Sequence, residues 1–340
     1  MKEAPVTLNP KSILIIKPSS LGDIVHTIPA VALVRDAYPD AEITWVINSE
    51  FVSLLRGNSD VNHVYIFPRG EFRGLSAPKS LLPWLRQTRR LRPDLALDFQ
   101  GLLRSALIAK ISCANQIYGM SDAREGSRWF YHRVAKVDRR AHAIERYLKL
   151  AELAGGAVGP AAAGLRCPIP TGDPLPRFDQ YPPFILLHPF ARGAGKSLST
   201  TVIKEFCHAF APTRVVVVGQ SRRGIDNPPE NCLDLTNQTS LLQLIWLIRA
   251  AHFIVSVDSG PMHIAASLTD RLLSIHTWTD PRRVGPYNPN AWIWKNGLLC
   301  RVNKLATTKM RKRGRPFKRK DIPALTELIR PLVPLDSMVA

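Results

Sequence analysis

The chain has 340 residues, of which 45% are hydrophobic and 21% charged, a composition typical of a soluble globular protein with two domains. No apolar stretch reaches the about 18 residues of a membrane span, the first residues lack a signal core, and the five scattered cysteines favour a reducing cytoplasm over a disulfide framework or zinc site. The chain has 46 Lys and Arg residues and 27 acidic ones. The resulting net charge of +19 attracts anionic partners such as nucleic acid, lipid headgroups or phosphorylated substrates.

Short apolar strands alternate with helices in the first part of the chain. The expected strands are 12–17, 43–47, 64–67 and 95–99. The expected helices are 23–37, 50–56, 79–91, 102–111 and 141–154. This alternation indicates βαβ units with a parallel sheet, so that 1–154 is predicted to be one Rossmann-like domain.

The stretch 155–183 is rich in Gly, Ala and Pro and shows no periodicity, so we expect a linker there. The alternation then starts again in the predicted second domain, 184–340. Its expected strands are 184–188, 215–219, 253–257 and 272–276, and its expected helices are 200–211, 239–251 and 261–268. The fold class is therefore α/β with two Rossmann-like domains.

The first strand leads into a short polar turn and then a helix, in the segment KSILIIKPSSLGDIVHTIPA (11–30). Asp23 stands in the first turn of that helix, at the carboxyl end of a strand, where open α/β sheets bind ligands. A carboxylate there can act as a general base, although capping the helix would also explain it. His26 is the alternative base. The single glycine of this turn, Gly22, excludes the usual Gly-x-Gly-x-x-Gly dinucleotide site.

A second strand–turn–helix junction reads VDSGPMH (257–263). The backbone N–H groups of Ser259 and Gly260 could contact a phosphate at the start of the helix, with the Ser259 hydroxyl and His263 as further donors. The simpler interpretation is that Asp258 or Ser259 caps the helix while His263 packs against a neighbour.

Lys196 lies in the loop that follows the strand at 184–188. The tripeptide Gly195-Lys196-Ser197 is not part of a P-loop, because the glycine required at position 190 is Phe190. The sequence also contains no Asp-x-Asp motif, which disfavours a metal held in that way. We therefore expect no metal and no cofactor, and cations or helix N-termini are left to stabilise an anionic leaving group.

Four segments resemble glycosyltransferase family 9, the ADP-heptose:lipopolysaccharide heptosyltransferases. The signature Lys-x-Ser-Ser-x-Gly-Asp-x-x-His-Thr-x-Pro-Ala is present at 17–30, and Asp-[Ser/Thr]-Gly-x-x-His at 258–263. The segment 98–106 and the Ala-Arg-Glu at 123–125 are most similar to the heptosyltransferase I subfamily. The resemblance implies the GT-B architecture, two Rossmann-like domains with a cleft between them, the first for the acceptor and the second for the nucleotide sugar.

The family also implies a reaction and roles for residues. The expected reaction is an inverting, metal-independent transfer of heptose from ADP-heptose to the lipopolysaccharide inner core, a Kdo-lipid A type acceptor. Asp23 would be the base, and the donor phosphates would be bound by Lys196, Asp258, Ser259, Gly260 and His263. The acceptor would be bound by Ser20, Gly22, His26, Gln100, Arg104 and Arg124. Acidic residues that contact the ribose in the family are replaced here by QSRR (220–223), so another nucleotide sugar is an alternative.

The segment 304–320 contains the run KMRKRGRPFKRK, in which eight of twelve residues are basic. Its Arg-Gly-Arg-Pro resembles an AT-hook core, so a non-catalytic nucleic-acid-binding protein on this scaffold is the alternative from another class. We rank attraction to the anionic inner membrane first, solvated charge second and DNA third. The expected location is cytoplasmic, peripheral on the inner face of the inner membrane.

Overall fold

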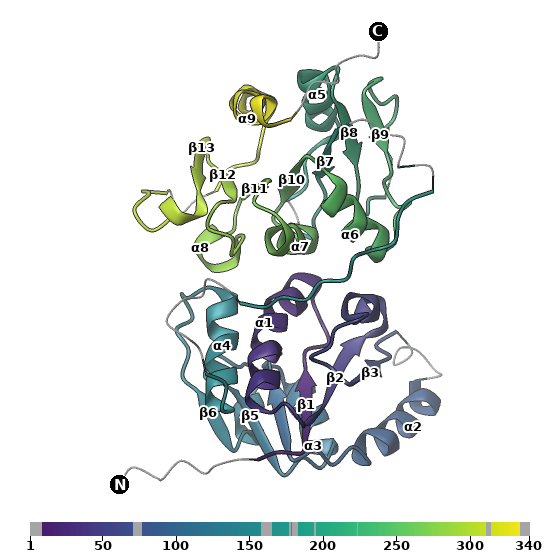
Figure 1. The fold of residues 1–340 in the computed structure, drawn as a ribbon, viewed down its shortest axis with the longest axis vertical. Coiled ribbons are helices and arrows are strands. Elements are labelled where there is room, and N and C mark those ends of the chain that lie inside the picture. Colours follow the sequence, from purple (N-terminus) through teal and green to yellow (C-terminus); the bar gives the residue numbers. More distant parts are fainter. Residues whose placement is uncertain are drawn as a thin grey trace. The chain divides into compact units, whose positions relative to one another are not determined.

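The computed structural model describes residues 9–70, 77–157, 165–176, 178, 183–193, 195–222, 224–310 and 314–333. The chain divides into two compact units, Met1–Pro168 and Ile169–Ala340, each built on one sheet with helices packed against it (Figure 1). Among the described residues, no helix is long and apolar enough to cross a membrane.

The first unit contains a six-stranded sheet in the order β3-β2-β1-β4-β5-β6, and all its neighbouring strands are parallel. The strands are β1 (Ser12–Ile16), β2 (Glu42–Asn48), β3 (His63–Phe67), β4 (Leu95–Asp98), β5 (Gln116–Met120) and β6 (Arg133–Ala135). The α-helices are α1 (Leu21–Ala37), α2 (Ala77–Arg89), α3 (Leu103–Ile111) and α4 (Ala143–Leu153).

Both faces of this sheet are covered, as the buried apolar strands require. Leu14 and Ile16 of β1 join a core cluster with Trp84 of α2 and Ile108 of α3, so these two helices lie on one face. Successive side chains of a strand point to opposite faces. The alternate residues of β1 are therefore buried on the other side of the sheet, and α1 and α4 pack against each other in the same unit.

The second unit has a seven-stranded sheet in the order β13-β12-β11-β10-β7-β8-β9, and only the β12–β13 pair is antiparallel. The strands are β7 (Phe184–His188), β8 (Arg214–Val217), β9 (Cys232–Asp234), β10 (Phe253–Val257), β11 (Leu272–Ile275), β12 (Trp292–Lys295) and β13 (Leu298–Arg301). The α-helices are α5 (Thr200–Phe210), α6 (Leu241–Ala250), α7 (Gly260–Leu268), α8 (Pro281–Val284) and α9 (Ile322–Ile329).

Both sheets have the strand order of a doubly wound Rossmann fold, with the direction of winding reversing between β1 and β4 in the first unit and between β7 and β10 in the second. Ligands of such sheets bind at the carboxyl ends of the strands, at this switch point. In each unit, most of the residues that the sequence singled out lie in the loops after these two strands or in the first turns of the helices that follow. The α/β, GT-B prediction is confirmed.

The predicted elements that fall on described residues are present, with one change of type: the helix expected at 50–56 is the 3₁₀ helix η1 (Ser49–Leu55). The strands β5, β6, β9, β12 and β13 are not among the elements that the sequence pattern predicts. The predicted linker at 155–183 includes residues outside the described part of the chain. Its described residues contain no helix or strand.

The end of the basic segment 304–320 is folded onto the second unit. Phe317 is buried and packs edge-to-face against Trp294 of β12, with 4.8 Å between ring centroids. Arg315 donates to both oxygens of Asp321 at 2.6 and 2.5 Å. A Cβ added at Gly314 would lie 1.4 Å from the carbonyl oxygen of Thr277, so only glycine fits this contact. The run 311–313 lies outside the described residues.

Candidate functional site

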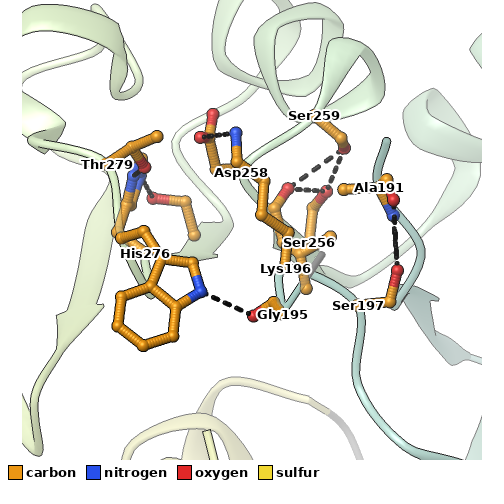
Figure 2. Close-up of polar contacts among 12 residues, drawn as sticks. Ala191, Gly195, Lys196, Ser197, Ser256, Asp258, Ser259, His276 and Thr279 are labelled. Carbon is orange, nitrogen blue, oxygen red and sulfur yellow. Dashed lines mark hydrogen bonds and ion pairs between the residues drawn. The ribbon is translucent and has the colours of Figure 1, made fainter. Parts of the chain in front are cut away.

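An ion pair lies at the switch point of the second sheet (Figure 2). The Nζ of Lys196, in the loop between β7 and α5, donates to Oδ2 of Asp258 at 2.8 Å, directly after the end of β10. The Asp258 side chain is 9% exposed and that of Lys196 is 27% exposed. The structure thus joins two residues that the sequence assigned separately to the same site, 62 positions apart.

The environment of Asp258 keeps its carboxylate charged. Burial alone would raise the pKa of Asp258, but the nearby His276 and the ammonium of Lys196, together with the Thr279 hydroxyl, hold it below its ordinary value. His276 is fully buried, which lowers its pKa to about 4, so this imidazole is neutral at neutral pH. Lys196 therefore carries the positive charge of the pair.

The junction between β10 and α7 holds the rest of the predicted donor residues. Ser259 is the N-cap residue of α7, and its Oγ donates to the Val257 carbonyl at 3.0 Å and lies 3.2 Å from Nδ1 of His188. Gly260 is the first residue of α7, and His263 is buried in its first turn. The positive end of the helix dipole is therefore close to the ion pair, in an arrangement suited to an anion.

Trp278 was not found from the sequence. Its indole Nε1 donates to the Gly195 carbonyl at 3.2 Å, and the residue is 46% exposed. Gly195 has φ +74°, and a Cβ there would come within 2.6 Å of Nε1. A tryptophan from the loop after β11 thus lies against the residue before Lys196.

The loop that carries Trp278 is fixed by a lysine of β12. Lys295 is 3% exposed and its Nζ donates to the Thr279 carbonyl at 2.6 Å. Burial lowers the pKa of Lys295, although nearby Asp280 opposes this shift. With Gly314 against Thr277, the basic segment and β12 together fix the loop that borders the ion pair.

Asp23 is the corresponding carboxylate of the first unit. Its Oδ2 accepts hydrogen bonds from the Ser20 backbone N–H at 3.2 Å and from the Ser20 hydroxyl at 2.8 Å, and its Oδ1 accepts one from the Tyr147 hydroxyl at 3.4 Å. The residue is half-buried in the first turn of α1. Asp23 therefore caps the helix while its side chain remains partly exposed.

Behind Asp23 lies a buried lysine whose contacts were not predicted. Lys17 is 2% exposed, and its Nζ donates to the Phe99 carbonyl and to the Tyr147 hydroxyl, both at 2.9 Å. Burial lowers the pKa of Lys17, while the charge of Asp23 opposes the shift. Burial and the charge of Asp23 raise the pKa of Tyr147 well above its usual value, so this phenol stays protonated and links the lysine to the carboxylate.

The other residues predicted to bind the acceptor differ in exposure. Gly22 and His26 are buried, and the His26 ring packs edge-to-face on His142 with 5.2 Å between centroids. Ser20 is exposed. This burial makes His26 a poorer candidate than Asp23 for the base.

Gln100, Arg104 and Arg124 surround the turn after β4, next to β1 in the sheet. Gln100 is half-buried, and its Oε1 has no hydrogen-bond partner within the described chain. Both arginines are exposed, and the Arg124 backbone N–H donates to the Gly101 carbonyl at 2.8 Å. The turn therefore presents two cations and an amide.

Asp98 stabilises the turn after β4 through hydrogen bonds to its buried carboxylate. Its carboxylate is fully buried and accepts hydrogen bonds from the backbone N–H groups of Gln100 and Gly101 and from the hydroxyls of Ser105 and Tyr131. Burial raises the pKa of Asp98. Its role is to fix the loop rather than to react.

Two Rossmann-like units with polar loops at both switch points are the architecture expected of a GT-B glycosyltransferase, and the solved structures that match this fold include heptosyltransferases. Within this class, the chain belongs to glycosyltransferase family 9 (heptosyltransferase), whose sequence profile matches residues 84–198 and 203–313.

Two curated relatives illustrate the similarity. The lipopolysaccharide core heptosyltransferase OpsX of Haemophilus influenzae is 25% identical over 298 residues, 82% of each chain. Lipopolysaccharide heptosyltransferase 1 of Pseudomonas aeruginosa is 28% identical over 311 residues, 81% of each chain.

Solved structures agree on the fold. The Escherichia coli ADP-heptose lipopolysaccharide heptosyltransferase II superposes with a TM-score of 0.72 at 21% identity, covering 94% of this chain and 98% of that one. The E. coli heptosyltransferase WaaC with ADP gives a TM-score of 0.68 at 22% identity, covering 94% and 99%.

Proposed function

We propose that this glycosyltransferase moves a heptose from ADP-heptose to the inner core of lipopolysaccharide, with inversion at the anomeric carbon. The proposal is supported by relatives named as lipopolysaccharide heptosyltransferases, which match more than four fifths of the chain. The observation that carries it is the Lys196–Asp258 ion pair at the start of α7.

In the donor half of the site, the developing charge is that of a departing diphosphate. Lys196, the N–H groups at the start of α7, the Ser259 hydroxyl and His263 would stabilise this charge. Asp258 would hold the Lys196 ammonium in place and orient its loop. A cation that is already oriented needs little rearrangement when the bond to the leaving group breaks.

In the acceptor half, Asp23 would take the proton of the attacking hydroxyl. The oxygen forms its bond to the anomeric carbon from one side as the bond to the diphosphate breaks on the other, so a single displacement inverts the centre. Asp23 is half-buried and accepts hydrogen bonds from the Ser20 hydroxyl and backbone N–H and from the Tyr147 hydroxyl. A partly exposed carboxylate at the carboxyl end of β1 is placed to take a proton as general base.

Gln100, Arg104 and Arg124 would bind the anionic acceptor. Arginine suits such a partner because its guanidinium can form bidentate hydrogen bonds with phosphate or carboxylate. The acceptor is lipid-linked, and we propose a cytoplasmic enzyme that is peripheral on the inner membrane.

Two alternatives differ in how the structure supports them. Another nucleotide sugar is favoured by the loop at 220–222, which carries no acidic residue. The nucleic-acid alternative is weakened because Arg315 of the Arg-Gly-Arg-Pro core is paired with Asp321 and Gly314 is packed against Thr277. An AT-hook needs both arginines extended along a groove.

Calorimetric titration with ADP, UDP and GDP tests the proposal. We expect selective binding of ADP, weakened by about 10- to 100-fold in Lys196→Ala, because a hydrogen bond from a charged group is lost. Lys204→Ala, which removes a cation from α5, is the control and should bind ADP normally. Preference for another nucleotide would keep the transferase and discard the heptose, and no binding to any nucleotide would contradict the proposal.

A further inference from the structure

Four arginines, Arg86, Arg89, Arg90 and Arg92, line a hollow at the carboxyl-terminal end of α2. All four are exposed, and none makes an ion pair or a side-chain hydrogen bond with another described residue. The stretch 77–92 contains no Asp or Glu. Their charges are therefore not neutralised locally, and a cluster of this kind attracts an anionic surface.

Large apolar side chains are exposed on the neighbouring elements. Leu82 of α2 is 50% exposed, Leu103 and Leu107 of α3 are each 39% exposed, and Trp129 of η2 (Ser127–Phe130) is 90% exposed. These elements adjoin one another, because α3 packs against both α2 and η2. The two leucines of α3 are four residues apart, on one face of that helix. Single exposed leucines are ordinary, but a tryptophan that is 90% exposed, in an element packed against the helix that carries two of these leucines, is not.

Charge and apolar groups also share the same helical faces. Leu82 precedes Arg86 by four residues and Arg89 by seven, which places all three on one side of α2. On α3 the same spacing joins Leu103, Leu107 and Lys110, and this helix contains no acidic residue. The outer side of α2, α3 and η2 thus combines cations with leucines and a tryptophan.

We propose that this surface, formed by α2, α3 and η2, docks on an anionic lipid membrane. The arginines would bind lipid phosphates, and the leucines and Trp129 would enter the interfacial region, where amphipathic aromatic rings are favoured. Nucleic acid would use the cations but would leave the apolar side chains in water. The inference rests on the proposed peripheral location of the enzyme and specifies the surface that contacts the membrane.

The assignment differs from the sequence-based expectation, which gave the membrane contact to the segment 304–320. In that segment the described arginines have acidic partners: Arg315 pairs with Asp321, and Arg319 pairs with Glu205 at 3.1 Å. The arginines at the end of α2 have none among the described residues. The arginine cluster at the end of α2 is therefore more available to bind an anionic surface than the described arginines of the segment 304–320.

The test is co-sedimentation of the full chain with vesicles of phosphatidylglycerol and phosphatidylcholine, compared with phosphatidylcholine alone. The variant Arg86→Gln/Arg89→Gln/Arg90→Gln should partition about 100-fold more weakly, since each surface cation contributes about a factor of five. The matched control Lys304→Gln/Lys309→Gln/Lys320→Gln removes the same charge and should bind as the wild type does. Trp129→Ala should weaken binding also at high salt, where charges are screened.

Equal loss in both triple variants, loss only in the lysine variant, or no binding of the wild type to anionic vesicles would overturn the proposal. It would also be overturned if duplex DNA binding, and not vesicle binding, depended on the three arginines. Transfer to a soluble, delipidated acceptor should be unchanged in the arginine variant. Failure of the proposed reaction would instead appear as absence of ADP binding in a protein that still binds vesicles.

Discussion

Asp23 and Asp258 both lie at the switch point of their sheet, but they are held in different ways. Asp258 is nearly buried, and its pKa is kept low by His276 and by the ammonium of Lys196, with which it forms an ion pair. Asp23 is half-buried and accepts hydrogen bonds from the Ser20 hydroxyl and backbone N–H and from the Tyr147 hydroxyl, which also contacts the Lys17 ammonium. A carboxylate in a nearly buried ion pair is suited to hold a group in place, whereas a half-buried carboxylate that accepts hydrogen bonds from hydroxyl groups can exchange a proton.

Asp23→Ala should have the largest effect, because it removes the proposed base. We expect kcat to fall by about 10³-fold, within the range of general-base catalysis, with ADP affinity nearly unchanged. Turnover assays and calorimetry on the same preparation measure both quantities. Equal loss of turnover and ADP binding would mean that Asp23 is structural, and the contrast with Asp258 would fail.

Acid should destabilise the second unit. Burial holds the pKa values of His188 and His276 at about 4, whereas both return to about 6.5 in the unfolded chain. The unfolded chain therefore takes up protons first, and the free energy of unfolding falls as the pH drops from about 6.5 to about 4, by about 3 kcal/mol per histidine. The lowered pKa of Asp258 adds a further loss only as the pH falls below the ordinary pKa of about 4.

Urea unfolding at pH 7 and pH 4.5 measures this loss. The variant His276→Gln should lose less stability on acidification than the wild type. The raised pKa of the buried Asp98 acts with the opposite sign in the first unit, where protonation on acidification favours folding. If the two units lost stability equally on acidification, the electrostatic difference between them would be refuted.

Tyr147→Phe tests how the surroundings of Asp23 differ from those of Asp258. Loss of the hydroxyl removes a donor to the carboxylate and leaves Lys17 one acceptor short, so the pKa of Asp23 should rise. The acidic limb of the kcat/KM profile should then move to higher pH, with a loss of about tenfold on the acidic side and little change at neutral pH. Tyr131→Phe, which removes a donor to Asp98 instead, is the control. A pH profile that does not shift would show that Tyr147 does not affect the pKa of the proposed base.

Trp278→Phe should have the smallest effect. It keeps an aromatic ring but removes the hydrogen bond to the Gly195 carbonyl, so the loop of Lys196 is held less firmly. ADP affinity should fall by about fivefold, the value of one neutral hydrogen bond, with kcat on saturating donor unchanged. Unchanged affinity in calorimetry would show that other contacts fix this loop.

The sequence predicted the central strands because their apolar runs are buried on both faces and are bounded by turns, as with β1, β7 and β10. The missed strands lack such runs. β5 includes Gly119 and begins with a polar residue, and β12 and β13 end in a cation. Their pairing is decided by neighbours in the sheet rather than by local pattern.

The candidate site was predictable where its residues fall in one short segment, as with Asp258 and Ser259. Contacts between distant segments were not predictable. Lys17 and Tyr147 are 130 residues apart, and Trp278 and Gly195 are 83 apart, with nothing in the spacing to pair them. Burial of a lysine is a property of the folded core, so the contacts of Lys17 could not be read from its motif alone.

The contact of Gly314 with Thr277 gives an apparently repetitive basic run one position that tolerates no side chain. In a library with every substitution at every residue of the run, exposed neighbours such as Lys318 and Lys320 should accept most replacements, and position 314 almost none. The same contact makes the C-terminal part of the chain a support for the loop that carries Thr277 and Trp278, next to the ion pair. Shortening the protein before Gly314 would remove this support together with Phe317 and the buried face of α9, so the second unit should lose stability as well as charge.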